Sequence, residues 1–253
     1  MVVSYVHPAE AVTAVFHHSI VGLLIHDMRH HRRIIDGGGH FPTVSGANIV
    51  NARNLAVRTF LDGHDADWLF TVDTDEAFAP DTVDRLVEAA HPQTRPIVGG
   101  LYYGIWHGSG QPVQFPQMFE WVDDPPGVSR IESWPPGQII PVGATGAGCM
   151  LIHRRVLQAM RSAHPEPWPW YAESVLDGQP ISEDITFCMR AGALGFPIFV
   201  HTGVEAAHQK PSLLTSHTYR GNTWDSKTSS HSDVTPNAEP AKPNAAAARR
   251  VST

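Results

Sequence analysis

Apolar residues along the chain fall into two alternating patterns: short continuous runs, and longer segments with an apolar residue every three or four positions. The continuous runs predict strands at residues 2–6, 33–36, 68–72, 97–101 and 147–152. The periodic segments predict helices at residues 8–28, 49–60 and 80–90, with Pro80 placed to open the last one. Strands that alternate with helices in this way predict a mostly parallel α/β sheet flanked by helices.

The second half of the chain is less regular. Between residues 104 and 137 the pattern weakens into Pro, Gly and aromatic residues, which predicts loops and an antiparallel excursion. A helix through Arg161 follows the strand at 147–152, and Ser182 can cap another helix that ends near Gly195, before a last strand at 197–201. Residues 221–253 contain almost no large apolar side chains, so we expect one domain at residues 1–220 and a disordered, low-complexity tail.

Composition narrows the class of protein. The hydrophobic fraction of 42% and the charged fraction of 17% are those of an ordinary globular protein. A formal net charge of -7 gives no attraction for nucleic-acid phosphates, so no nucleic-acid partner is expected. Cys149 and Cys188 are too few for a disulfide framework and are expected to be small buried hydrophobic residues. Without an export signal or a run long enough to span a bilayer, the sequence favours a cytoplasmic location and no transmembrane segment.

Two aspartates follow the predicted strand at 68–72 directly, in the sequence Asp73-Thr-Asp75. Side chains i and i+2 of an extended segment point to the same side, so both carboxylates are expected to face one pocket. Their repulsion is relieved when a divalent cation lies between them and an anionic ligand, and carboxylates together with phosphate oxygens suit Mg²⁺ or Mn²⁺. Ligands of open α/β sheets also collect at the carboxyl ends of strands. The pattern favours a metal and phosphate site over an acidic turn that merely follows a strand.

Other segments accompany this motif in a fixed order. Asn51-Ala-Arg53-Asn54 precedes it, and the segments GAGCMLIHRR at 146–155 and SEDITFCMR at 182–190 follow it. Together these segments resemble the GT-A glycosyltransferases, particularly family 2-like members, over roughly residues 2–208. The resemblance implies a GT-A, Rossmann-like fold and the transfer of a sugar from a nucleoside diphosphate sugar.

The resemblance also implies roles for individual residues. Asp73 would contact the donor ribose or the metal, Asp75 would ligate the metal, and Arg53 would contact the nucleotide. Asp36, at the end of the predicted second strand, is similarly placed to hydrogen-bond the base. His208 would complete the metal sphere, since neutral imidazole suits Mn²⁺ beside carboxylates. The alternatives are a solvated helix residue for Arg53, a turn cap for Asp36 and a structural histidine for His208.

Glu183 and Asp184 begin a predicted helix, where the helix dipole alone would favour negative charge. The family likeness favours a catalytic role, because an acceptor hydroxyl needs a carboxylate within hydrogen-bond reach to remove its proton. Asp184 is the better candidate for this base, with Glu183 orienting the acceptor or the base. If Asp184 is the base, the reaction inverts the configuration of the anomeric carbon.

Aromatic residues and histidines elsewhere are open to two interpretations. Trp168, Trp170 and Tyr171 lie in a Pro-rich loop before the predicted base, where they could pack on a sugar or an acceptor, or belong to the core. His26 and His30 have the spacing of a helical metal pair, but no H-E-x-x-H motif surrounds them, so a solvated or structural role is expected.

The sequence thus predicts a hexosyltransferase-type enzyme that uses Mn²⁺ or Mg²⁺, a UDP- or GDP-sugar donor, and a hydroxyl acceptor on a protein, glycan or lipid. One alternative is a metal-dependent phosphatase or nucleotidyl-transfer enzyme with Asp73 as nucleophile. Against it, Glu76-Ala77 follows the motif instead of the Gly-Thr turn of the haloacid dehalogenase pattern. The other alternative is a non-catalytic carbohydrate-binding protein on the same fold, which the intact acids at each matched position argue against.

Overall fold

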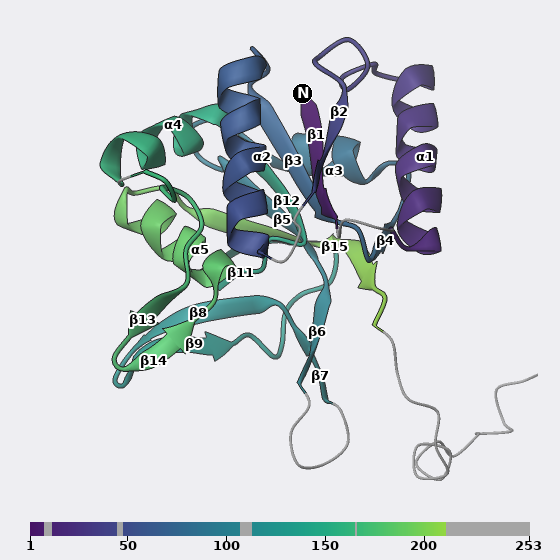
Figure 1. Ribbon diagram of the computed structural model, residues 1–253. Helices are drawn as coiled ribbons and strands as arrows, with labels where there is room; N and C mark the ends of the chain where they lie inside the picture. The colour runs from purple at the N-terminus through teal and green to yellow at the C-terminus, as the bar shows by residue number, and fades with distance from the viewer. Residues whose placement is uncertain (8–11, 45–47, 107–112, 165, 211–253) are drawn as a thin grey trace, which may run out of the picture. The chain divides into compact units, whose positions relative to one another are not determined.

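A mixed sheet of mostly parallel strands forms the centre of the fold (Figure 1). Its main path has the order β10-β15-β5-β12-β3-β1-β2, with the short β4 paired to β15. The strands are β1 (Val2–His7), β2 (His40–Val44), β3 (Trp68–Asp73), β4 (Glu76–Phe78), β5 (Ile97–Leu101), β10 (Ile139–Val142), β12 (Cys149–His153) and β15 (Ile198–His208). β1, β2, β3, β5 and β15 run in one direction, while β4, β10 and β12 run against their neighbours. The predicted α/β class is confirmed.

Helices cover both faces of this sheet, as Figure 1 shows. The helices are α1 (Ala14–Arg29), α2 (Ile49–Gly63), α3 (Thr82–Ala89), α4 (Arg154–Ala163) and α5 (Glu183–Ala193). On one face, α2, α4 and α5 pack against sheet residues such as Leu69 and Ile152. On the other face, α1 and α3 pack against residues such as Phe70 and Leu151. Because successive strand residues face opposite layers, the central strands are mostly apolar on both faces, as the continuous runs predicted.

The computed structural model describes residues 1–7, 12–44, 48–106, 113–164 and 166–210. Met1–Lys210 form one unit with its own core. The predicted tail at 221–253 lies outside the described residues. No described helix combines the length and the apolar character that a membrane span requires.

An antiparallel excursion extends from the carboxyl end of β5, as the sequence predicted. It contains β6 (Tyr103–Trp106), β7 (Val113–Pro116), β8 (Met118–Asp123), β9 (Pro126–Arg130) and β11 (Ala144–Thr145). β6 pairs with β7, and β8 pairs with both β9 and β11. A separate hairpin, β13 (Ser174–Leu176) with β14 (Gln179–Ile181), leads into α5.

The predicted second strand at 33–36 is wrong, because these residues form turns and β2 begins only at His40. The carboxylate of Asp27 accepts hydrogen bonds from the backbone N–H groups of Ile34 and Ile35, at 3.1 and 3.0 Å from Oδ2. Gly39, with a positive φ of 75°, donates its N–H back to the Ile34 carbonyl oxygen over 2.7 Å. Local hydrogen bonds of this kind compete with a sheet ladder, and here they fold a short apolar run into a loop.

Candidate active site

The acidic turn between β3 and β4 is the centre of the site. Asp73 is the last residue of β3, and Glu76 is the first residue of β4. Between them, the Thr74 carbonyl oxygen accepts hydrogen bonds from the N–H and the hydroxyl of Thr13, over 3.1 and 2.8 Å. Thr13 is also the N-cap of α1, so this helix start holds the turn in place.

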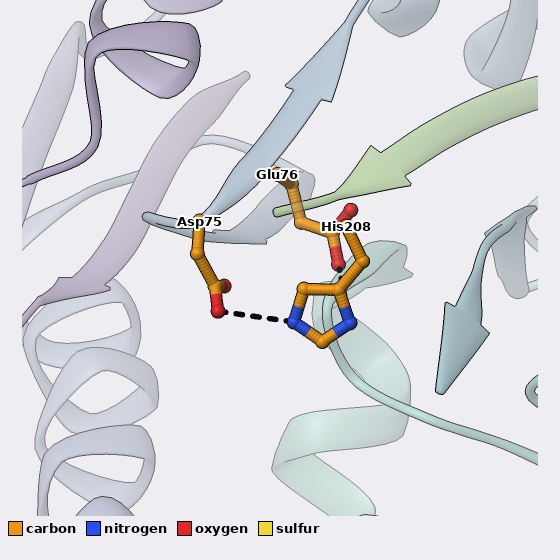
Figure 2. A group of neighbouring side chains, drawn as sticks. All are labelled: Asp75, Glu76 and His208. Atoms are coloured by element: carbon orange, nitrogen blue, oxygen red, sulfur yellow. Dashed lines mark hydrogen bonds and ion pairs between the residues drawn. The ribbon is translucent and has the colours of Figure 1, made fainter. Parts of the chain in front are cut away.

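The late strand β15 brings His208 to this turn. β4 pairs antiparallel with β15, and His208 lies opposite Glu76 in the register. His208 Nε2 is 3.0 Å from Asp75 Oδ2, and His208 Nδ1 is 3.7 Å from Glu76 Oε1 (Figure 2). One ligand atom from each of these three residues lies within 4.8 Å of the other two. We call Asp75, Glu76 and His208 the acid–histidine cluster.

The hydrogen bonding of His208 determines what its second nitrogen can do. Nδ1 lies 3.0 Å from the carbonyl oxygen of Tyr103. A carbonyl oxygen only accepts hydrogen bonds, so Nδ1 carries a hydrogen. A hydrogen bond from Nε2 to Asp75 then requires the doubly protonated ring, whereas the neutral ring offers the Nε2 lone pair to a cation. A backbone carbonyl that fixes the ring in this way is the usual partner of a metal-ligating histidine.

The two acids of the cluster have opposite electrostatic environments. Burial, together with the negative charges of Asp73 and Asp75, raises the pKa of Glu76 to about 9. Burial also acts on Asp75, but hydrogen bonds from His208 and from Lys210, whose Nζ is 2.8 Å from Oδ2, outweigh it and lower its pKa to about 2. Asp75 is therefore ionised at neutral pH. Glu76, whose oxygens have no hydrogen-bond donor among the described residues, holds a proton.

A divalent cation fits this cluster on three observations. Glu76 is fully buried, and neither of its carboxylate oxygens has a hydrogen-bond partner among the described residues. Asp73 Oδ1 is likewise buried without a partner. Buried polar atoms almost always have a partner, so these oxygens need one. Two carboxylates and a neutral imidazole nitrogen are also a suitable donor set for Mn²⁺.

Arg53 connects the acidic turn to the start of α5. Its guanidinium donates from Nη2 to Asp73 Oδ2 over 3.0 Å, from Nε to Glu183 Oε1 over 3.3 Å and from Nη1 to the Ala147 carbonyl oxygen over 3.3 Å. Its side chain is only 8% exposed. Burial lowers the pKa of Arg53, but the negative charge of Asp73 and its acidic neighbours more than reverses this and raises it. Arg53 is thus a buried ion-pair bridge, and the solvated helix residue considered from sequence is excluded.

Glu183 and Asp184 differ in which of their oxygens are occupied. Burial raises the pKa of Glu183 above its usual value, although Arg53 opposes this. Asp184 Oδ1 accepts hydrogen bonds from the Ser182 hydroxyl and, over 2.8 Å, from the Ile185 N–H. Asp184 Oδ2 makes no hydrogen bond with the residues that the structure describes, and it lies on the side of Gly146, 3.1 Å from where a Cβ at that position would stand. One oxygen of Asp184 is thus anchored, and the other faces the site.

Tyr102 fills the space between these groups. Its Oη accepts a hydrogen bond from the Gly148 N–H over 3.2 Å, and its side chain is almost fully buried. A Cβ at Gly146 would stand 1.8 Å from Tyr102 Oη, and a Cβ at Gly148 would stand 3.1 Å from Glu76 Oε1. Glycine is required at both positions because the backbone passes directly beside these side chains. Burial, with the charges of Asp184 and Asp73, raises the pKa of Tyr102, so its hydroxyl stays protonated.

The structure brings together all but one of the residues that the sequence singled out for the site. Asp73, Asp75 and His208 meet at the carboxyl end of the sheet, and Arg53 links Asp73 to Glu183, which neighbours Asp184. Asp36 is not among them. It lies in an exposed turn before β2, paired with Arg32, and therefore at the opposite end of the parallel strands. Its expected position at a strand end depended on the predicted second strand.

The aromatic loop divides into core and surface. Trp170 and Tyr171 are buried, and the indole N–H of Trp170 donates to the Leu157 carbonyl oxygen over 2.8 Å. Trp168 is 44% exposed. His26 donates to or accepts from Asp84 over 2.9 Å, and its ring stacks on that of His30, which fits the expected structural role. Cys149 and Cys188 are free and buried, as predicted.

Sequence reasoning missed Glu76 and Tyr102. Glu76 is one position beyond Asp75, so strand alternation placed it on the other face, and only the pairing of β4 with β15 returns it to the cluster. For Tyr102 a signal existed, since an aromatic residue with a polar tip directly follows the buried strand at 97–101.

The cavity next to this site is separate from it. A space of about 640 Å³ is lined by α1 residues, by Ala77 and Phe78, and by Glu205 and Ala207. Ala77 and Ala207 alternate with Glu76 and His208 along their strands, so their side chains point to the opposite face of the ribbon. This cavity carries none of the clustered acids.

Strand order, helix placement and the acidic strand end together define a GT-A-like α/β fold. The solved structure of A197 from STIV matches it with a TM-score of 0.50 and 15% identity, over 83% of this chain and 86% of that one. The structure of GalNAc-T7 with UDP, GalNAc and Mn²⁺ matches with a TM-score of 0.53 and 11% identity, over 82% of this chain. The match covers 42% of the GalNAc-T7 chain. No protein-family model and no curated protein sequence matches the chain.

Proposed function

We propose that this protein is a metal-dependent, family 2-like glycosyltransferase that moves a sugar from a UDP- or GDP-sugar to a hydroxyl acceptor with inversion. The observation that carries the proposal is the convergence of the acid–histidine cluster, the Arg53 bridge and Asp184 at one end of the sheet. The GT-A-like fold supports it, as does the presence of UDP, GalNAc and Mn²⁺ in the GalNAc-T7 structure.

Asp75 and His208 would hold the cation, with Glu76 as an additional buried ligand and Asp73 directed to the cation or the donor ribose. Bound there, Mn²⁺ or Mg²⁺ would supply Lewis-acid stabilisation of the departing diphosphate. Lys210 Nζ now supplies positive charge beside Asp75 Oδ2 and would give way to the cation. The fixed tautomer of His208 and the unpartnered oxygens of Glu76 support this assignment.

Asp184 would act as the general base. Its Oδ1 is held by Ser182 and by the Ile185 N–H, which leaves Oδ2 to take the proton of an acceptor hydroxyl as that oxygen attacks the anomeric carbon. Glu183 would position the site through Arg53, whose guanidinium pairs with both Asp73 and Glu183. A contact of Arg53 with the nucleotide would use its remaining N–H groups.

A screen of nucleotide sugars for metal-dependent release of free nucleotide tests the proposal. We expect release from one class of donor with Mn²⁺ or Mg²⁺, and loss of that release with EDTA. Hydrolysis of generic phosphate esters in place of nucleotide sugars would contradict the proposal. So would sugar binding without turnover, which is the behaviour of a carbohydrate-binding protein on this fold. No feature of the site described above favours the phosphatase or nucleotidyl-transfer enzyme, or the carbohydrate-binding protein.

A further inference from the structure

Trp168 is presented to solvent on a loop that is fixed from several sides. Its indole N–H donates to Asn51 Oδ1 over 2.6 Å, and its carbonyl oxygen accepts from Arg190 Nη1 over 2.7 Å. One residue earlier, the Pro167 carbonyl oxygen accepts from Arg58 Nη2 over 3.1 Å. The ring is therefore held in one orientation although nearly half of it is exposed. Held in this way, the ring presents a large apolar face with a fixed orientation, on which a ligand can pack.

A cavity of about 230 Å³ lies beside this ring. Of the residues that the structure describes, it is lined by Asn48, Val50, Trp168, Ala172 and Glu173. The cavity is smaller than the roughly 300–1,000 Å³ of pockets for drug-sized molecules, and has room for about one sugar ring. It combines one aromatic face with a few polar groups, which is the composition of a small-molecule site.

Two polar side chains at the cavity can form hydrogen bonds with the hydroxyl groups of a ligand. Asn48 uses Oδ1 to cap α2, accepting from the Asn51 N–H over 3.0 Å, and its amide NH₂ remains a donor. Glu173 is exposed and forms no ion pair or hydrogen bond with any residue that the structure describes. An aromatic face packs on the C–H groups of a sugar, while an amide and a carboxylate bond its hydroxyls.

The walls of the cavity are joined by hydrogen bonds and chain neighbours to the helix that carries the proposed base. Asn48 and Val50 belong to the turn of α2 that precedes Arg53, which bonds Glu183. On the other side, the residue after Glu173 is Ser174, whose hydroxyl is 2.7 Å from that of Thr186 in the first turns of α5. Both walls of the cavity are thus tied to the helix start that carries Asp184.

We propose that the Trp168 cavity is a carbohydrate subsite that binds a sugar ring of the acceptor, so that the acceptor is a glycan. The acceptor role rests on the proposed glycosyltransferase activity, while sugar binding does not. Trp168 stacks on the ring, and Glu173 and Asn48 bond its hydroxyl groups.

The first experiment measures sugar binding with neither donor nor metal present. Saturation-transfer NMR is recorded with lactose, maltose, cellobiose and N,N′-diacetylchitobiose on the full chain. We expect transfer from at least one disaccharide, lost in Trp168→Ala, reduced in Glu173→Gln and partly kept in Trp168→Phe. Trp121→Ala, at an exposed tryptophan on β8, is the matched control and keeps the signal. If no disaccharide gives a signal that depends on Trp168, the subsite is wrong.

The second experiment separates this inference from the activity. With an active donor, Trp168→Ala should raise the acceptor KM at least about tenfold while kcat and acceptor-free donor hydrolysis stay unchanged. An unchanged acceptor KM, or saturation by a Ser/Thr peptide in place of a glycan, overturns the acceptor assignment. Trp168-dependent sugar binding without any donor turnover keeps the subsite and contradicts the proposed function instead.

Discussion

Arg53 and Asp73 lie 20 positions apart in the chain and are joined by a 3.0 Å hydrogen bond from Nη2 to Oδ2. Arg53 comes from the buried side of α2, and Asp73 ends the central strand β3. The same guanidinium reaches Glu183 at the start of α5. One side chain therefore sets the relative positions of the donor-side acid and the helix that carries the proposed base.

Removing this bridge should destabilise the protein strongly. Arg53→Met leaves Asp73 and Glu183 as partly buried acids without their cation, and the loss should approach that of a buried pair broken from one side, about 3–5 kcal/mol. Arg58→Met, one turn later on the same helix, breaks an exposed pair with Glu166 and should cost at most about 1 kcal/mol. Urea unfolding of both variants measures the difference. Equal losses would show that Arg53 does not hold the site together.

Asp75→Asn should remove metal binding without unfolding the chain. The substitution keeps the shape of the side chain but removes the anionic ligand beside His208. We expect Mn²⁺ and nucleoside diphosphate affinity to fall by roughly 10–100-fold or more, measured by calorimetry. Asp36→Asn is the control, because Asp36 lies in an exposed turn at the other end of the strands. Parental affinity in Asp75→Asn would remove the proposed metal site.

The buried acid Glu76 should make the stability of the metal-free protein depend on pH. Its pKa is about 9 in the folded state and 4.5 in the reference state, so the folded chain holds an extra proton between these values. This contribution to stability is complete below 4.5 and is lost as pH rises toward about 9. Unfolding of EDTA-treated protein over this range should show a decline that Glu76→Gln flattens.

Cation binding should reverse the decline in stability that the metal-free protein shows as pH rises. A carboxylate must be ionised to ligate a metal, so Mn²⁺ affinity of the parent should rise with pH over the same interval. Parallel stability curves for the parent and Glu76→Gln would show that the Glu76 proton is not lost in this range.

Gly146 should tolerate no side chain. A Cβ there would lie 1.8 Å from Tyr102 Oη, so Gly146→Ala must displace Tyr102 or the backbone and should cost at least about 1–3 kcal/mol. Adding Tyr102→Phe removes the clashing oxygen and should restore part of the melting temperature. Gly192→Ala, in α5 with nothing within 4 Å, should be neutral or stabilising. A harmless Gly146→Ala would contradict the close packing described for Tyr102.

The part of the site that the sequence predicted is the part encoded by local pattern. An apolar strand that runs into Asp73-Thr-Asp75 places two acids at a strand end, and that position is confirmed. The wrong strand prediction at residues 33–36 also came from local pattern. Ile34 and Ile35 match a strand pattern, but the Asp27 carboxylate, on the preceding helix, holds their N–H groups in a loop.

Two features of the site depend on pairing between distant parts of the chain and could not be predicted from local pattern. The position of Glu76 follows from its register with His208, which is 132 positions later. The burial of Arg53 follows from acids on two other elements. The alternation of residues within one strand or helix cannot predict the position of Glu76 or the burial of Arg53, because both depend on which elements become neighbours.

Asp184→Asn should separate proton removal from donor binding. The amide keeps the size of the side chain, and its oxygen can still accept from Ser182 and the Ile185 N–H, but it cannot take a proton. Transfer should therefore fall by about 10²–10⁴-fold. Donor and metal affinity should hardly change, because the acid–histidine cluster is untouched.

A purely structural role of Asp184 at the start of α5 predicts a different result. Loss of the charge would weaken the interaction with the helix dipole by about 0.3–1 kcal/mol and leave turnover largely intact. Melting temperature, nucleotide affinity and transfer rate, measured on one preparation, distinguish the two roles. Asp81→Asn, at the N-cap of α3, is the matched control, since it removes a charge from the start of a helix that carries none of the site residues. Near-parental transfer by Asp184→Asn would exclude Asp184 as the base, and the argument for inversion would fall with it.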